Sequence, residues 1–257
     1  MSKVTFGLED CLGIITLNDP PFNLLGKDLI DDLQSIMNEL KQKSIRGLLL
    51  KSEGGNFSAG ANMSLFSGGG STGGREILDL FLGIVHCIET LPYPTLASVN
   101  GLCLGGGFEL ALACDLIWAA DNAKLGSPEV SIGTIPLGAG SRSIAARAGM
   151  ARAKEMVYEG KFYTAEKLEQ WNIVNKILPE SELHEQALKY IKKLSEGPTL
   201  AHAVTKRLHN EYYNHGSNSS DDLLLEIVPA LFETNDFMNG VKSLMDNGPG
   251  KAKFNAS

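Results

Sequence analysis

Short apolar runs and one-sided helical repeats alternate along the first fifty residues. Val4–Phe6, Leu12–Leu17 and Arg46–Ser52 have the apolar character of β-strands, and the last run suits a strand buried on both faces. Between them, Asp28–Gln42 has the spacing of an amphipathic helix. Its apolar positions are Leu29, Leu33, Ile36, Met37 and Leu40. The predicted order is therefore strand, strand, helix, strand.

The middle of the chain continues this alternation. Arg75–Leu91 has apolar residues on one helical face, and two prolines follow it. Thr95–Leu104 is a β-rich apolar run that leads through Gly105–Gly107 into an apolar helical segment carrying one carboxylate, Glu109. The low-complexity stretch Ser67–Gly74 is expected to be flexible, as a mobile lid or a disordered loop.

Helical patterns dominate after residue 137. Gly138–Met150 is compatible with a turn that leads into a helix. Thr164 is placed to cap a helix that runs to Asn172, and Ser181 is placed to cap the next one.

The chain changes character at Gly197. Residues 198–213, 221–234 and 236–245 all have helical patterns, with loops at GSNSS and NGPG. These segments carry more apolar residues than a self-contained polar tail needs, so we expect them to pack against the core and against neighbouring subunits. We therefore divide the chain into a core, 1–196, and a C-terminal helical region, 197–257.

Composition and charge exclude several classes of protein. The net charge of −7 disfavours a nucleic-acid backbone or an anionic membrane as a partner. The N-terminus has no signal-peptide pattern, and no apolar run approaches the roughly 18 residues of a membrane span. The cysteines are expected to be free thiols in a reducing compartment, so we predict a cytoplasmic protein. They are Cys11, Cys87, Cys103 and Cys114.

Metal and nucleotide motifs are absent from the sequence. The five histidines show neither HxH nor HExxH spacing and have no cysteine partners, which makes a metal site improbable. There is no GxxxxGK[ST], and no GxGxxG stands at a strand-to-helix turn. A formal GxSxG match at Gly69–Gly73 has no preceding strand and is not interpreted as a serine hydrolase. Any chemistry must therefore depend on carboxylates and backbone donors.

The glycine turn at Gly105–Gly107 is the strongest candidate for such chemistry. The first N–H groups of a helix have no intrahelical acceptor, and together with the helix dipole they can hold an anion or a developing oxyanion. Glu109 lies in that first turn, and Glu129 follows in the loop-like SPEV. Ala59–Ala61 is small enough for close approach of a ligand and can offer a second N–H donor. Taken singly, each feature also fits ordinary packing, a helix-terminal charge or a surface turn.

Three motifs in this order resemble the crotonase, or enoyl-CoA hydratase/isomerase, superfamily. They are FSAGAN (57–62), SVNGLCLGGGFELALACD (98–115) and LGSPEVSIGTIP (125–136). The resemblance extends over nearly the whole chain, including NDPPFNLL (18–25) and the C-terminal helices. It implies an α/β fold, a spiral of ββα units with a C-terminal helical trimerisation region, assembled as a homotrimer or a dimer of trimers.

Site residues follow from the same resemblance. The oxyanion hole would be the N–H groups of Ala61 and Gly106, and the catalytic carboxylates would be Glu109 and Glu129. The other substrate-binding positions would be Phe22, Ala59, Asn62, Met63 and Gly105. Coenzyme A would enter as part of an acyl-CoA substrate, with no separate cofactor.

The resemblance implies an enoyl-CoA hydratase, which adds water across the C2–C3 double bond of a 2-enoyl-CoA thioester. Glu129 would give the proton to C2 and Glu109 would activate water, a division that the sequence leaves open. An enoyl-CoA isomerase, which needs one positioned base, is the alternative, and a non-enzymatic acyl-CoA-binding or RNA-associated scaffold is a third reading.

Two departures from the common family pattern concern the substrate. The usual basic residue after the oxyanion motif is missing at Asn62–Ser64, and Lys251 or Lys253 could replace its contact to the CoA phosphates. PLGAGSRSI (136–144) replaces the common PGAGGTQRL near the acyl pocket. Acyl-chain preference is the property these changes affect.

Overall fold

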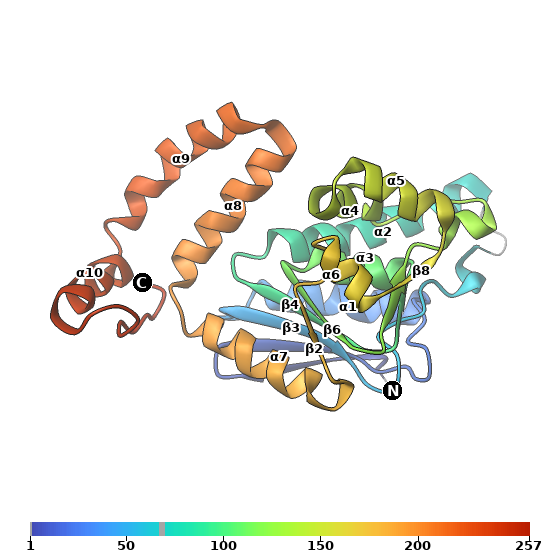
Figure 1. Ribbon diagram of the computed structural model, residues 1–257, viewed down its shortest axis with the longest axis horizontal. Coiled ribbons are helices and arrows are strands. Elements are labelled where there is room, and N and C mark those ends of the chain that lie inside the picture. The colour runs from blue at the N-terminus through green and yellow to red at the C-terminus, as the bar shows by residue number, and fades with distance from the viewer. Residues whose placement is uncertain (1, 67–69) are drawn as a thin grey trace.

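A twisted six-stranded sheet forms the centre of the molecule (Figure 1). The computed structural model describes residues 2–66 and 70–257, with the side chains of 70–73 excluded. The strand order is β1-β2-β3-β4-β6-β9, antiparallel between the first two and parallel elsewhere. The bounds are β1 Val4–Glu9, β2 Leu12–Leu17, β3 Gly47–Ser52, β4 Thr95–Val99, β6 Leu116–Ala120 and β9 Lys176–Leu178.

Helices cover both faces of this sheet, which explains why its inner strands are apolar throughout. All five residues of β4 are buried, and five of the six in β3 are buried. Helix α7 (Glu180–Ser195) packs on one face against β3, β4 and β6. Helices α1 (Lys27–Leu40), α2 (Gly70–Thr90) and α3 (Gly106–Ala113) lie on the other side. The predicted amphipathic helix of residues 28–42 is confirmed, and its apolar face is fully buried.

The β-rich run Thr95–Leu104 forms two strands, which belong to different sheets. The chain turns at Asn100–Gly101, and β5 (Leu102–Leu104) joins a second sheet of order β5-β7-β8, with β7 Lys124–Gly126 and β8 Phe162–Thr164. Gly101 has φ +53, and a Cβ there would stand 1.9 Å from the Gly55 carbonyl oxygen. Only glycine allows this turn, which separates the two sheets.

The apolar run after the glycines is likewise divided. Helix α3 stops at Ala113, and the following residues form β6 rather than more helix. Asp115 lies at the junction, where its Oδ2 accepts hydrogen bonds from the backbone and side chain of Thr95 at 2.8 and 2.9 Å. These bonds align β6 with β4.

The segment before α2 also differs from the prediction. Part of the expected flexible stretch, 67–69, lies outside the described residues, as does one glycine of the GxSxG match. Residues 70–74 are not a loop but the first turns of α2. A short 3₁₀ helix, η1 (Met63–Phe66), precedes them.

The predicted helix starts of the second half are partly confirmed. Thr164 caps α6 (Ala165–Gln170) by accepting a 3.3 Å bond from Lys167 N. Ser181 does not cap α7, which begins one residue earlier after Pro179. The helical pattern after residue 137 forms two helices, α4 (Gly140–Ala148) and α5 (Met150–Glu159), divided at Gly149 with φ +83.

The C-terminal helices leave the core as an arm (Figure 1). They are α8 (Thr199–His215), α9 (Ser217–Leu231) and α10 (Asn235–Asn247). Helices α8 and α9 pack as a hairpin, and the expected GSNSS loop shrinks to Gly216 because Ser217–Ser220 are helical. Lys206 of α8 anchors the arm through a 2.9 Å ion pair with Asp115. Among the helices of the described residues, none has the length and hydropathy of a membrane span.

Candidate active site

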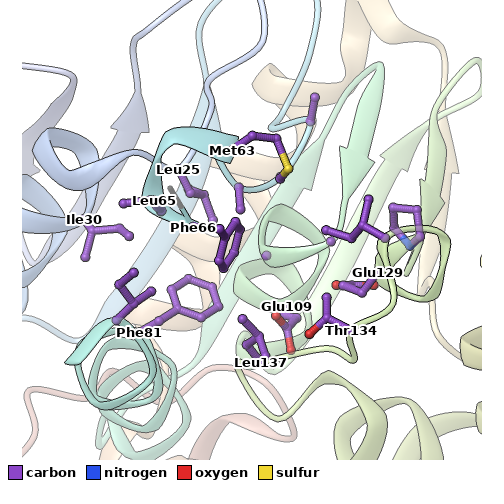
Figure 2. Close-up of a pocket in the computed structure, with 18 of the residues that line it drawn as sticks. Leu25, Ile30, Met63, Leu65, Phe66, Phe81, Glu109, Glu129, Thr134 and Leu137 are labelled. Atoms are coloured by element: carbon purple, nitrogen blue, oxygen red, sulfur yellow. The ribbon is translucent and has the colours of Figure 1, made fainter. Parts of the chain in front are cut away.

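A mainly apolar pocket of about 220 Å³ opens between α1, α2, the start of α3 and the 3₁₀ helix η2 (Glu129–Ile132). Figure 2 shows Glu109 and Glu129 on one side of it and the apolar side chains on the other. The described lining residues are Leu25, Ile30, Ala59–Ala61, Met63, Leu65, Phe66, Ile77, Phe81, Gly105, Gly106, Glu109, Pro128, Glu129, Ser131, Ile132, Thr134 and Leu137. Five segments of the sequence thus converge on one cavity.

The loop carrying Ala61 and the turn carrying Gly106 are held in backbone contact. Ser58 forms a parallel bridge with Cys103, donating from its N–H to the Leu102 carbonyl at 3.0 Å. Further along, a Cβ on Gly60 would stand 2.9 Å from the Leu104 carbonyl oxygen. The approach therefore requires glycine at position 60, where φ is +97.

Two backbone donors are left free at this junction. Among the described residues, neither Ala61 N–H nor Gly106 N–H has a protein acceptor. Gly106 is the first residue of α3, so its N–H cannot bond within the helix. Both residues line the pocket, which gives it two amide hydrogens for an oxygen atom.

Glu109 is held rigidly by backbone amides. It is 2% exposed, and its Oε1 accepts hydrogen bonds from Gly138 N at 2.7 Å and Gly140 N at 2.8 Å. Burial raises the pKa of the Glu109 carboxyl to about 7, against the lowering effect of the Gly140 bond, and the nearby Glu129 carboxyl raises it further. A carboxyl with this pKa can gain or lose a proton at neutral pH.

Glu129 faces the same pocket with no bonding partner. Both of its carboxylate oxygens are buried and accept no hydrogen bond from the described residues. Its Oε1 approaches Gly105, whose Cβ, if present, would stand 3.3 Å away. Burial raises the pKa of this carboxyl above its usual range, which favours its protonated form. A buried acid without a partner needs a ligand to satisfy it.

The other predicted site residues are divided by the structure. Ala59, Met63 and Gly105 line the pocket. Phe22 and Asn62 do not lie among its described lining residues: the Phe22 carbonyl accepts a 2.9 Å bond from Ala59 N, and Asn62 Oδ1 accepts a 3.0 Å bond from Ser64 N. Both support the loop that borders the pocket.

The candidate phosphate contacts lie elsewhere in the chain. Lys251 and Lys253 are exposed near the C-terminus and are not among the described residues that line the pocket. Phe254, beside them, accepts a hydrogen bond from Arg46 at the base of the arm. In the parts of the chain that the structure describes, no cluster of three His, Cys, Asp or Glu side chains could hold a metal ion.

Sequence comparison identifies the scaffold around this pocket. Residues 8–252 match the sequence model described as "Enoyl-CoA hydratase/isomerase". The chain belongs to the enoyl-CoA hydratase/isomerase family. That match spans nearly the whole chain, including the arm.

Individual members of the family are similar along their full length. The mitochondrial enoyl-CoA hydratase of Pongo abelii is 29% identical, with 96% of this chain and 85% of that protein covered. The crotonyl-CoA hydratase of Syntrophomonas wolfei is 28% identical, with 96% and 95% covered. The crystal structure of enoyl-CoA hydratase from Bacillus anthracis is 25% identical with a TM-score of 0.89, and 95% of this chain and 96% of that one are covered. The crotonase fold expected from the sequence is therefore confirmed.

Several residues that shape the site in this enoyl-CoA hydratase/isomerase family member escaped the sequence analysis. Gly138 and Gly140 supply the amides that hold Glu109, and Phe81 and Leu137 form part of the apolar wall. The glycines of PLGAG (136–140) are visible in the sequence, but they are equally typical of a helix start. Phe81 lies on the apolar face of a helix and could not be distinguished from ordinary core.

Proposed function

We propose that this protein is an enoyl-CoA hydratase. The observation that carries the proposal is the pair Glu109 and Glu129, which face one pocket beside two free amide hydrogens. Glu109 is buried, and both carboxylate oxygens of Glu129 are buried without a partner among the described residues. An isomerase needs one positioned base, whereas water addition uses an acid and a base together. The names of the relatives support the same activity.

The free amides suit the charge that develops during hydration. The N–H groups of Ala61 and Gly106 would bind the thioester oxygen, which becomes an enolate oxygen when water attacks C3. Donors placed for such an oxygen contribute about 3 to 4 kcal/mol each to transition-state stabilisation. The α3 dipole adds a positive potential at Gly106.

The two carboxyls divide the proton transfers. The ionised form of Glu109, held by two amides, takes a proton from water while the water oxygen bonds to C3. Glu129 acts as the acid and gives a proton to C2; burial of its carboxyl without a partner raises its pKa and so favours the protonated form that this role needs. The C2–C3 π bond is consumed, and the product is the 3-hydroxyacyl thioester. One proton must then pass from Glu109 to Glu129, directly or through the next water, to restore the starting state.

Coenzyme A is in this proposal the carrier of the substrate and not a separate cofactor. We also propose that the arm mediates association into trimers or dimers of trimers. Its support is a set of exposed apolar side chains on α9, on α10 and in the turn between them, which a monomer would leave in water. They are Leu224, Leu225, Phe232, Phe237, Met238, Val241, Leu244 and Met245. In such an assembly, Lys251 or Lys253 could reach the CoA phosphates of a neighbouring copy's site.

The test is a panel of thioesters incubated with the purified protein. Crotonyl-CoA should lose its enoyl absorbance and gain the mass of one water. A 3-enoyl-CoA should not be converted to its 2-enoyl isomer at a comparable rate. Isomerisation without hydration would replace the proposal with the isomerase alternative, and binding without turnover of any thioester would make the protein a scaffold.

A further inference from the structure

The apolar end of the pocket raises the question of which acyl groups fit. We propose that Leu137 and Phe81 restrict this enzyme to short, unbranched and uncharged enoyl groups, with crotonyl-CoA preferred over medium-chain thioesters. The inference rests on the proposed hydratase function and names its substrate class. It interprets the segment 136–144, where the sequence departs from the common family pattern.

Phe81 is fixed close to the reacting carbonyl. A Cβ on Gly106 would stand 3.3 Å from Phe81 Cζ, so the edge of the ring lies beside the residue whose N–H points to the thioester oxygen. A Cβ on Gly138 would stand 2.4 Å from Phe81 Cε1, so the ring also occupies space that only glycine leaves open at position 138. Phe81 is 5% exposed and therefore has little freedom to move away.

Leu137 extends this wall toward the catalytic carboxyls. It directly precedes Gly138, whose N–H binds Glu109 and whose Cα faces the Phe81 ring. Its half-buried side chain lines the pocket, and in Figure 2 it lies between Phe81 and Glu109. An acyl carbon beyond the reacting pair would therefore meet Leu137 and Phe81 within a few atoms of the carbonyl.

The remaining walls at this end are also rigid and apolar. Leu25 is 2% exposed and Ile30 is 4% exposed, and a Cβ on Gly106 would stand 2.7 Å from Leu25 Cδ1. The polar lining side chains, Glu109, Glu129, Ser131 and Thr134, come from α3 and the 129–134 segment instead. A charged or hydroxylated acyl terminus would lose its hydration against this wall without gaining a partner, so such substrates are disfavoured.

The opposite border of the pocket is more open. Met63 is 54% exposed and Phe66 is 43% exposed, so they offer a long acyl chain a route toward solvent. If a long acyl chain left the pocket by that route, Leu137 and Phe81 would have no effect on the enzyme's preference for chain length. A closed wall predicts that substitutions of Leu137 and Phe81 change the chain-length preference, whereas an exit beside Met63 and Phe66 predicts no change.

The experiment compares kcat/KM for crotonyl-CoA and 2-octenoyl-CoA in the full-length enzyme and in variants. For the wild type we expect a crotonyl preference of at least about tenfold, because a single excess methylene in an apolar pocket already costs that much. Leu137→Ala and Phe81→Ala should each lower the crotonyl-to-octenoyl ratio at least about tenfold. Butyryl-CoA and octanoyl-CoA, measured as competitive inhibitors, should show the same shift in their inhibition constants.

Two matched controls come from the same segments. Ile135→Ala changes a residue of the same loop that is 64% exposed and does not line the pocket, and Leu82→Ala changes the α2 neighbour of Phe81, 38% exposed. Both should leave the ratio within about twofold of wild type. The inhibition constants keep the test valid for a variant with low turnover, and circular dichroism identifies a variant that has not folded.

Each outcome has a separate meaning. Unchanged ratios in both wall variants, or a wild type that hydrates 2-octenoyl-CoA as well as crotonyl-CoA, would overturn the inference while the hydratase proposal stands. Failure of the wild type to hydrate any enoyl-CoA would overturn the proposed function itself. Equal shifts in the controls and the wall variants would show that chain length is not set at this wall.

Discussion

Gly140 N donates a 2.8 Å hydrogen bond to Glu109 Oε1, and a Cβ at residue 140 would stand 2.8 Å from that same oxygen. The missing side chain of Gly140 thus leaves the space that the Glu109 carboxylate occupies. The position of Glu109 therefore depends on a glycine 31 residues away as well as on its own helix.

Gly140→Ala should displace the Glu109 carboxylate and lower kcat for crotonyl-CoA by about tenfold to a hundredfold, because small misplacements of reacting groups are costly. The effect should fall on kcat more than on KM, since the oxyanion donors are not touched. Steady-state kinetics checks this. Gly83→Ala is the matched control, because nothing lies within 4 Å of its added Cβ in helix α2, and its kcat should equal that of wild type.

The raised pKa of Glu109 predicts a cost in stability. The folded-state pKa of about 7 lies above the ordinary value of 4.5, so the fold favours the protonated form. The contribution of Glu109 to the free energy of unfolding is therefore largest below about pH 4.5. It is lost as pH rises from there through 7, by about 3 kcal/mol in total.

Glu109→Gln removes this ionisation and should remove its share of the pH dependence of the free energy of unfolding. Urea unfolding at about pH 5 and pH 8 should show wild type losing up to about 3 kcal/mol more than the variant between the two values. The comparison across pH cancels any constant effect of the amide. A parallel loss of stability in both proteins would mean that Glu109 ionises in the fold as freely as in water.

Arg46 connects the core to the arm at three points. Its guanidinium donates to Thr199 Oγ1 at 3.0 Å, to the Gly197 carbonyl at 2.7 Å and to the Phe254 carbonyl at 3.1 Å. Lysine cannot reproduce this fork, so Arg46→Lys should lower the free energy of unfolding by about 2 to 4 kcal/mol.

Hydrogen exchange should show where that stability is lost. Amides near Gly197 and in the last residues of the chain should exchange faster in Arg46→Lys, while those of β3 and β4 keep their protection. Arg75→Lys serves as control, because its side chain is 76% exposed and should change stability by less than about 0.5 kcal/mol. If the amides near Gly197 and at the C-terminus exchange no faster in Arg46→Lys than in Arg75→Lys, Arg46 does not anchor the arm.

The sequence predicted elements where one segment carries its own signal. The apolar face of α1 and the helix cap at Thr164 are local patterns, and both are found in the structure. The strands β5, β7, β8 and β9 have three residues each, too few for a period to emerge, and they exist because neighbours pair with them. The break at Gly101 was equally hidden, since the obstacle is the Gly55 carbonyl from another loop.

The candidate site shows the same limit. Glu109 could be singled out because a carboxylate in an apolar helix is costly without a partner. Its partners, Gly138 and Gly140, could not be identified, because they approach only when α3 and α4 pack together. The sequence likewise gave no sign that both Glu129 oxygens would be buried and unpaired.

The most direct test of the central claim, that Glu109 and Glu129 together catalyse hydration, is the rate of crotonyl-CoA hydration by wild type, Glu129→Gln and the exposed control Glu169→Gln. Glutamine keeps the shape of Glu129 but cannot give a proton to C2, so kcat should fall by at least about a hundredfold while butyryl-CoA still binds within a few fold of wild type. Glu169→Gln should match wild type. Hydration by Glu129→Gln at the wild-type rate would contradict the account.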